Sequence, residues 1–174
     1  MSTRIISVVA GCLLTLTLTM ARAAEPDRLP AAVAADLKAV ADECSGVGGR
    51  PITKDAARRV DLTGDGRDDF VLYNGWITCE NAASVYGDRH KRLAVYAADT
   101  QGGAAIAYED WVYDARVEGS GREASLWLTT SGEGCGRKPV ASFANEAFCD
   151  RAIVWNGATK KFAYAPVSTV RMIE

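Results

Sequence analysis

Four carboxylates crowd into the segment VDLTGDGRDDF, residues 60–70. In a D-x-[DN]-x-D-G loop, side-chain oxygens on alternate residues of a curled backbone point toward one centre, and the glycine at position six permits the sharp turn. Gly66 occupies that position here. Ca²⁺ suits such a loop because it accepts about 6–8 oxygen ligands in loose geometry. The sequence therefore predicts a structural calcium site. The expected ligands are Asp61, Thr63, Asp65, Asp69 and the main-chain carbonyl of Arg67.

Two positions depart from the helix-flanked calcium loop of EF-hands. Thr63 stands where that loop has Asp or Asn, and Leu72 stands where it has a bidentate glutamate. Residues typical of strands flank the loop, so an EF-hand is excluded. The alternative to an ion is a turn whose acids are solvated and whose Gly-Asp-Gly serves turn geometry.

The segment DLTGDGRDDFVL resembles the calcium loops of the FG-GAP and VCBS type, with the usual form D-x-[DN]-G-D-G-x-x-D-hydrophobic. The resemblance implies a loop that joins two β-strands and the same ligands as above. The motif occurs once, so it implies the loop and not a multi-bladed propeller.

The wider layout resembles small exported proteins of Gram-negative bacteria. They share an N-terminal helix that ends in Cys, an acidic loop of this kind, and three further Cys-containing segments. Here those segments are CENAAS (79–84), GEGCG (132–136) and CDRAIVW (149–155). This resemblance implies no particular activity.

The first 23 residues have the pattern of a cleaved signal peptide. Arg4 precedes an uncharged apolar stretch, Ile5–Met20, and Ala21-Arg22-Ala23 is the small-x-small pattern before a cleavage site. An uncleaved anchor and a lipoprotein box at Cys12 are the alternatives. We expect a periplasmic or secreted protein with a polar leader at 24–30, a single disulfide-stabilised domain at 31–174, and no membrane span after signal removal.

The charge of the mature chain excludes some partner classes. The full chain of 174 residues has a formal net charge of −2, and removal of 23 residues with two arginines and no acids leaves 151 residues and a charge of −4. A mildly acidic protein is not expected to bind nucleic acid or an anionic membrane surface.

Four cysteines remain after signal removal: Cys44, Cys79, Cys135 and Cys149. An even number in an exported protein indicates disulfides, and four cysteines allow three pairings. We favour Cys135–Cys149, which closes a loop of about 15 residues and contributes on the order of 3 kcal/mol. Cys44–Cys79 then follows by elimination.

The periodicity predicts an α+β fold that is mainly β. Residues 31–43 place Val33, Leu37 and Val40 on one face at helical spacing. The segments that follow are rich in β-formers and are separated by Gly, Asp and Asn, which favours an antiparallel meander sheet or small sandwich with one N-terminal helix. The strand-like segments are 57–62, 70–79, 92–99, 105–119, 124–130, 151–157 and 161–167.

Other residues offer weaker signals. His90 lies in a polar segment, YGDRHKR, where a surface position is the expectation and a catalytic role the alternative. Trp76, Trp111, Trp127 and Trp155 lie in or beside apolar strands, where we expect packing; a carbohydrate platform is the alternative.

The segment 131–149 is long for a hairpin loop, and we expect a disulfide to close it. Its candidate partner-binding residues are Arg137, Lys138 and Phe143. The leading hypothesis is a non-enzymatic exported binding domain that contacts a protein or glycan of the cell envelope. One alternative is an inhibitor of an envelope hydrolase that acts through this loop, and another is a hydrolase that uses His90 or the acidic loop.

Overall fold

The computed structural model describes residues 28–138 and 140–173. The expected signal peptide at 1–23 and residues 24–27 of the expected leader lie outside the described residues. In the part of the chain that the structure describes, no helix combines the length and the apolar character needed to cross a membrane.

The described residues form one α-helix, α1 (Ala31–Gly46), which follows Pro30. It buries Val33, Val40 and Cys44, which repeat at helical spacing and so form one apolar stripe. Gly48 follows the helix with a positive φ of 81°, a conformation that glycine adopts without steric cost. The helix extends three residues beyond the expected end at residue 43.

The remaining elements are strands and short 3-10 turns. The strands are β1 (Arg50–Ile52), β2 (Ala57–Val60), β3 (Asp69–Tyr73), β4 (Thr78–Glu80), β5 (Lys91–Ala98), β6 (Ala104–Val112), β7 (Asp114–Glu118), β8 (Ser125–Ser131), β9 (Phe148–Asn156), β10 (Lys161–Tyr164) and β11 (Arg171–Met172). The 3-10 turns are η1 (Asn74–Trp76), η2 (Gly121–Glu123), η3 (Gly132–Cys135), η4 (Phe143–Asn145) and η5 (Val167–Thr169).

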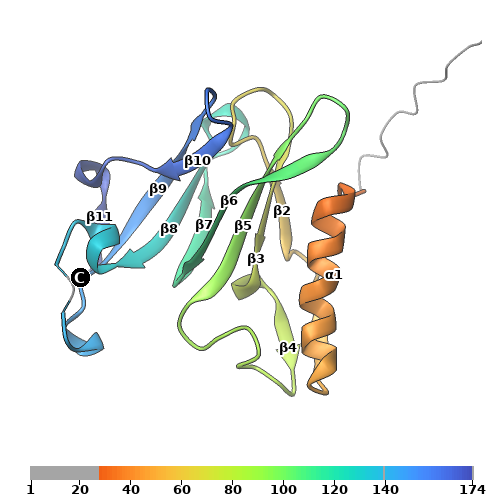
Figure 1. The fold of residues 1–174 in the computed structure, drawn as a ribbon, viewed down its shortest axis with the longest axis horizontal. Coiled ribbons are helices and arrows are strands. Elements are labelled where there is room, and N and C mark those ends of the chain that lie inside the picture. The colour runs from red at the N-terminus through yellow and green to blue at the C-terminus, as the bar shows by residue number, and fades with distance from the viewer. Residues whose placement is uncertain (1–27, 139, 174) are drawn as a thin grey trace, which may run out of the picture.

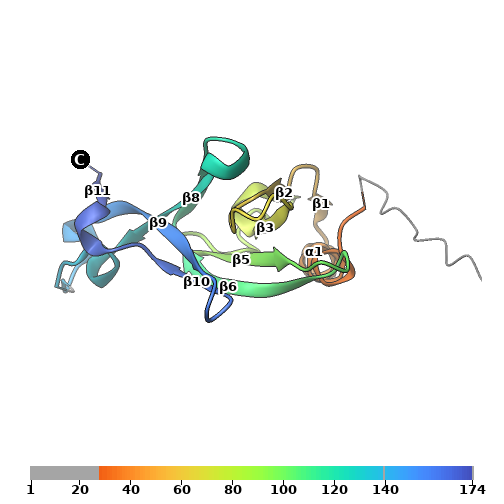
Figure 2. The ribbon, with the colours of Figure 1, turned by 90° about the horizontal axis from the view of Figure 1, so that it is seen from above.

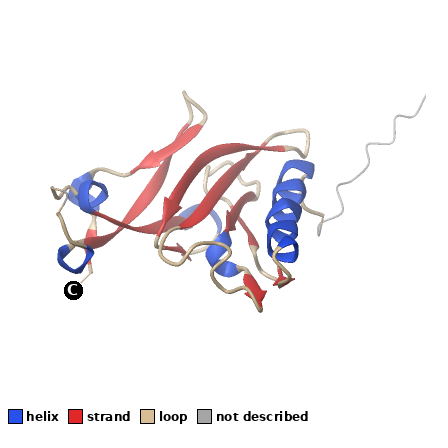
Figure 3. Ribbon diagram, turned by 60° about the horizontal axis from the view of Figure 1, so that its bottom comes forward, coloured by secondary structure: helices blue, strands red, loops and turns tan. Residues whose placement is uncertain are grey.

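Two antiparallel sheets form most of the fold (Figure 3). One has the order β2-β3-β5-β6, and the other has the order β10-β9-β8-β7 with β11 paired to β9. A small third sheet pairs β1 with β4. The fold is therefore α+β and mainly β, as the sequence predicts.

The β2-β3-β5-β6 sheet lies between α1 and the second sheet (Figures 1 and 2). One of its faces packs on α1, and the other packs on residues of β7 to β10. In β3 the side chains alternate between these two cores: Phe70 and Leu72 face the helix, whereas Val71 and Tyr73 face the second sheet. This explains why every residue of β3 is buried.

Two expected strands are divided in the structure. The segment 105–119 forms β6 and β7, which belong to different sheets, and the chain passes from one to the other at Tyr113. The Tyr113 N–H donates to the Thr129 carbonyl at 3.0 Å, and its carbonyl accepts from the Tyr73 hydroxyl at 2.9 Å. Likewise, η1 interrupts the segment 70–79 between β3 and β4.

Two disulfides connect the elements, in the pairing that the sequence analysis favoured. Cys44–Cys79 ties the end of α1 to β4, with a Cα–Cα distance of 5.8 Å. Cys135–Cys149 closes the connection between β8 and β9, with a Cα–Cα distance of 5.7 Å. Both are typical of proteins that fold in an oxidising compartment.

Candidate functional site

The acidic loop connects β2 to β3, so strands flank it on both sides. Its first carboxylate, Asp61, caps the turn: the Gly64 N–H donates to Oδ1 at 2.7 Å, and the Gly66 N–H donates to Oδ2 at 2.9 Å. Gly64 and Gly66 both have positive φ values, 76° and 84°. The curled backbone expected from the sequence is thus present, and its amides point at a carboxylate.

The last carboxylate of the loop, Asp69, is completely buried. Its Oδ2 accepts from the N–H groups of Leu62 at 2.9 Å and Thr63 at 2.8 Å, and its Oδ1 accepts from the Ala98 N–H at 3.0 Å. Burial raises the pKa of Asp69 above its ordinary value of 3.8, and these backbone donors offset part of the rise. Asp69 therefore fastens the loop to β5.

The other predicted ligands are arranged differently. Asp65 accepts from the Arg67 N–H at 2.9 Å and forms an ion pair with the Arg67 guanidinium. The Thr63 hydroxyl oxygen is buried beside the Asp69 carboxylate, whose pKa it helps to lower. Across residues 28–138 and 140–173, no group of three or more His, Cys, Asp or Glu side chains is gathered as a metal site would require. Calcium binding stays a prediction.

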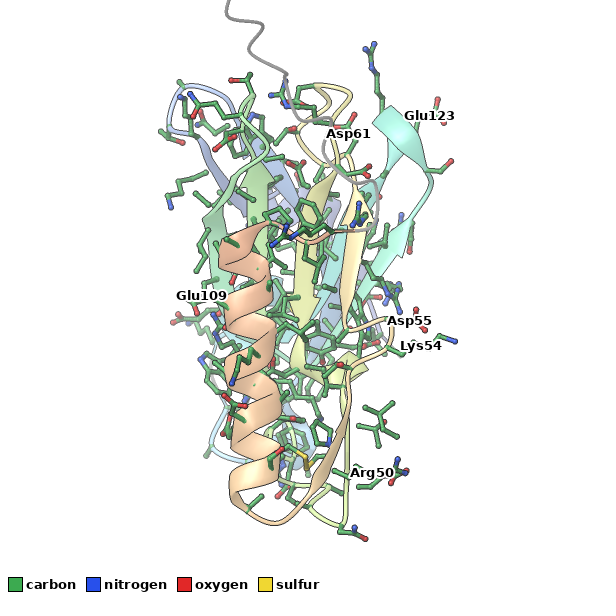
Figure 4. The ribbon with its side chains drawn as sticks, turned by 90° about the vertical axis from the view of Figure 1, so that its right-hand side faces the viewer. Arg50, Lys54, Asp55, Asp61, Glu109 and Glu123 are labelled. Atoms are coloured by element: carbon green, nitrogen blue, oxygen red, sulfur yellow. A yellow bond between two sulfur atoms is a disulfide. The ribbon has the colours of Figure 1, made fainter. Side chains whose placement is uncertain are left out.

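A hollow of about 520 Å³ adjoins the loop. Thr63, Asp65 and Arg67 line one side, and residues of the β5–β6 and β9–β10 turns line the other. Figure 4 shows Asp61 and Glu123, which belongs to the β7–β8 connection, at the same end of the molecule. Connections from both sheets therefore meet around the acidic loop.

The 131–149 segment lies toward the other end of the second sheet (Figure 1). The disulfide and two hydrogen bonds fix the two ends of this segment. The Gly132 N–H donates to the Ala147 carbonyl at 3.2 Å, and the Arg151 guanidinium donates to the Gly134 carbonyl at 2.9 Å. Between the two cysteines, residues 136–138 and 140–145 are all exposed. The three predicted contact residues, Arg137, Lys138 and Phe143, lie in this exposed part.

An aromatic cluster supports the exposed segment, and sequence reasoning missed it. The Phe143 ring lies 5.4 Å from that of Phe148, which in turn lies 4.9 Å from Tyr113. The Arg89 guanidinium stacks 4.0 Å from the centre of Phe143, and His90 stacks 4.0 Å from Tyr113. We call these five residues the aromatic cluster. No spacing in the sequence signals it, because the sheet topology brings its three segments together.

His90 is therefore part of the support of the 131–149 segment. It is exposed, as expected. The structure brings the segment that contains His90 into contact with the disulfide-closed segment 131–149, although the sequence gives a separate prediction for each. The acidic loop belongs to a different end of the molecule (Figures 1 and 4). Comparison with known protein families, with curated proteins and with solved structures finds no match to this chain.

Proposed function

We propose that the protein is an exported, non-enzymatic binding domain that contacts a protein partner in the cell envelope through residues 136–145. The observation that carries this proposal is an exposed segment fixed at both ends by Cys135–Cys149 and supported by the aromatic cluster. A segment fixed in this way loses little conformational freedom on binding, which favours affinity. The two disulfides support export.

The side chains of this segment indicate the chemistry of the partner. Arg137 and Lys138 are exposed, and no acidic residue lies between positions 136 and 145. Phe143 is 42% exposed and Val140 is 48% exposed, although both are apolar. A cationic edge beside exposed apolar side chains complements an acidic cleft with an apolar floor. An inhibitor of an envelope hydrolase is the narrower form of this proposal.

Charge reversal tests the proposal. The variant Arg137→Glu/Lys138→Glu should reduce capture of the partner from envelope extract by about tenfold or more, since contacts at the centre of an interface dominate its affinity. Phe143→Ala should have a similar effect. The matched control is Arg122→Glu/Lys160→Glu, which changes the charge equally at exposed positions outside this segment.

The outcomes separate a specific surface from a general charge effect. Equal losses in the loop variant and the control would reject the proposal, as would the absence of any captured protein with the unmodified chain. Thermal unfolding of each variant serves as the check that the fold survives. Hydrolase assays of the same extracts, with and without the protein, test the narrower inhibitor proposal.

We also propose that the acidic loop holds a structural Ca²⁺. The curled backbone of the loop supports this, because Gly64 and Gly66, both with positive φ, wrap the chain around the Asp61 carboxylate. Each oxygen of Asp61 accepts one N–H, and a carboxylate oxygen has capacity for more than one partner. Binding would require Asp65 to exchange Arg67 for the ion.

A further inference from the structure

Exposed apolar side chains gather at the end of the molecule that carries the segment 131–149. They belong to three elements: the exposed part of that segment, the 3-10 turn η5, and the strand β11 with the residue after it. Their exposed fractions lie between 42% and 48%. A gathering of this kind, in contrast to single scattered side chains, marks an interaction surface. We call it the terminal apolar surface, and its residues are Val140, Phe143, Val167, Met172 and Ile173.

The turn η5 packs on the start of the exposed segment 136–145. A Cβ placed on Gly136 would overlap Val167 Cγ1, so these two residues are in direct contact. Thr169 closes the turn, because its N–H and its hydroxyl both donate to the Pro166 carbonyl, at 2.9 Å and 2.7 Å. Val167 is therefore held beside the segment.

The strand β11 lies beside the other end of the segment. Met172 pairs with Cys149 of β9, and the Ile173 N–H donates to the Phe148 carbonyl at 3.0 Å. The Phe148 ring in turn lies 5.4 Å from the Phe143 ring. Figures 1 and 2 both show β11 at the same end of the molecule as the connection between β8 and β9. Direct contacts therefore join the three elements at one end of the second sheet.

The open edge of β11 favours a protein over a lipid surface as the partner. Because the Ile173 N–H points at β9, the N–H and C=O of Met172 point away from β9. Among the described residues, no strand pairs with β11 on this side. The apolar interior of a bilayer offers such backbone groups no hydrogen bond, whereas the backbone of a protein partner does.

The charges at this end disfavour a second copy of the chain. Three exposed cations belong to it: Arg89, which stacks on an aromatic ring of the surface, Arg137 and Lys138. The segment 131–149 contributes one exposed acid, Glu133. A symmetric dimer uses the same surface on both copies, so it would bring the cations of the two copies toward each other. Acidic side chains on a different protein complement them.

We propose that η5 and β11 belong, together with the segment 136–145, to the interface through which this protein binds its partner. The partner is a different protein that presents an apolar surface bordered by acidic side chains. This inference rests on the function proposed above and extends it, because it assigns the C-terminal strand a direct contact with the partner. It predicts that Phe143 and Ile173 contact the same protein.

Site-specific photocrosslinking in the cells that produce the protein tests this prediction. Phe143→p-benzoylphenylalanine and Ile173→p-benzoylphenylalanine place a photoreactive group on the segment and beside β11. After irradiation, both full-length variants should give an adduct of the same mass. The control is Trp111→p-benzoylphenylalanine, which should not give this adduct. Trp111 belongs to β6 and is 59% exposed, although the sequence predicted that it packs within the protein.

A charge placed beside β11 tests whether this strand contributes to binding. In the Phe143→p-benzoylphenylalanine protein, Ile173→Asp should reduce the yield of the adduct by about tenfold, since an acidic side chain would then face an apolar and acidic surface. The matched control is Val154→Asp, because Val154 is 48% exposed on β9 and lies outside the terminal apolar surface. This control should change the yield by less than about twofold. Equal melting temperatures of the two variants verify that the fold survives.

Failure of this inference and failure of the proposed function give different results. An adduct from the Phe143 variant without one from the Ile173 variant would overturn the inference and leave the proposed function intact. The absence of an adduct from both variants would overturn both. An adduct with twice the mass of the chain would show a second copy as the partner, and an added mass of one lipid would show a membrane surface. Either of these results would also overturn the inference.

Discussion

Asp69 is the residue on which the conformation of the acidic loop depends most. It accepts hydrogen bonds from three backbone N–H groups while completely buried. Asp69→Ala would leave these donors without a partner, and we expect a decrease of about 2–4 kcal/mol in the free energy of unfolding. Urea unfolding measures this decrease in the free energy of unfolding. Asp68→Ala, the exposed neighbour, is the control and should change stability by less than about 0.5 kcal/mol. Equal effects of the two variants would contradict this role.

Asp150 gives the protein a defined dependence on pH. Burial raises the pKa of Asp150. The hydrogen bonds from Arg116 and Thr129, together with the charge of Arg116, lower the pKa by more than burial raises it, so the net pKa lies below its ordinary value of 3.8. A lowered pKa in the folded state means that Asp150 stabilises the protein above the pKa of the unfolded chain. This contribution is lost as the pH falls through the folded-state pKa.

The variant Asp150→Asn isolates this contribution. At neutral pH it should be less stable than the unmodified protein. Between about pH 5 and pH 2 the difference should shrink, because the unmodified protein loses the contribution and the variant never had it. Denaturant unfolding at each pH measures the difference. A difference that stays constant with pH would show that Asp150 acts through packing alone.

At the scale of elements, the contact between α1 and β4 leaves no room beside its disulfide. A Cβ on Gly49 would overlap Cys79 Sγ and would lie 2.8 Å from Cys44 Sγ. Gly49→Ala should therefore lower the free energy of unfolding by about 1–3 kcal/mol. The control is Gly46→Ala at the end of the helix, where a Cβ meets nothing within 4 Å; it should be neutral or stabilising. Thermal unfolding of the oxidised variants distinguishes these results.

The connection between β2 and β3 is where the calcium proposal is tested. Addition of about 1 mM CaCl₂ to protein in EDTA should raise the melting temperature by on the order of 5 °C, and Mg²⁺ should raise it less. Asp65→Ala should remove the response, whereas Asp68→Ala should keep it. In EDTA, Asp65→Ala should be nearly neutral, since its ion pair with Arg67 is exposed. An equal response of both variants would exclude the loop as the site.

The sequence predicted the helix and most of the strands because local physical signals determine them, although it predicted neither β1 nor β11. The strand β5 occupies 91–98, where the expected segment was 92–99. The pairing of Cys135 with Cys149 followed from the short loop between them. Tyr113 gave no comparable signal, since it continues a run of β-formers although the chain changes sheets there. The support of Phe143 by Arg89, and the contact of Val167 with Gly136, arise only from the three-dimensional fold.

For the whole molecule, the β2-β3-β5-β6 sheet makes the two cores interdependent. Leu72 belongs to the core on the α1 side, whereas Leu128 of β8 belongs to the core between the sheets. Both are completely buried, so each change to Ala should cost about 2–5 kcal/mol. Because β3 and β5 supply side chains to both cores, neither core can be lost without exposing the shared sheet. We therefore expect one cooperative unfolding transition.

Amide hydrogen exchange provides the test of this cooperativity. In the unmodified protein, the most protected amides of α1 and β8 should exchange with the same free energy of opening. Leu72→Ala and Leu128→Ala should each lower both values, although each variant alters only one core. If Leu72→Ala lowered protection in α1 alone, the helix layer would be a separate unfolding unit. The α1 side of the shared sheet would then open independently of the second sheet, which carries the segment 136–145.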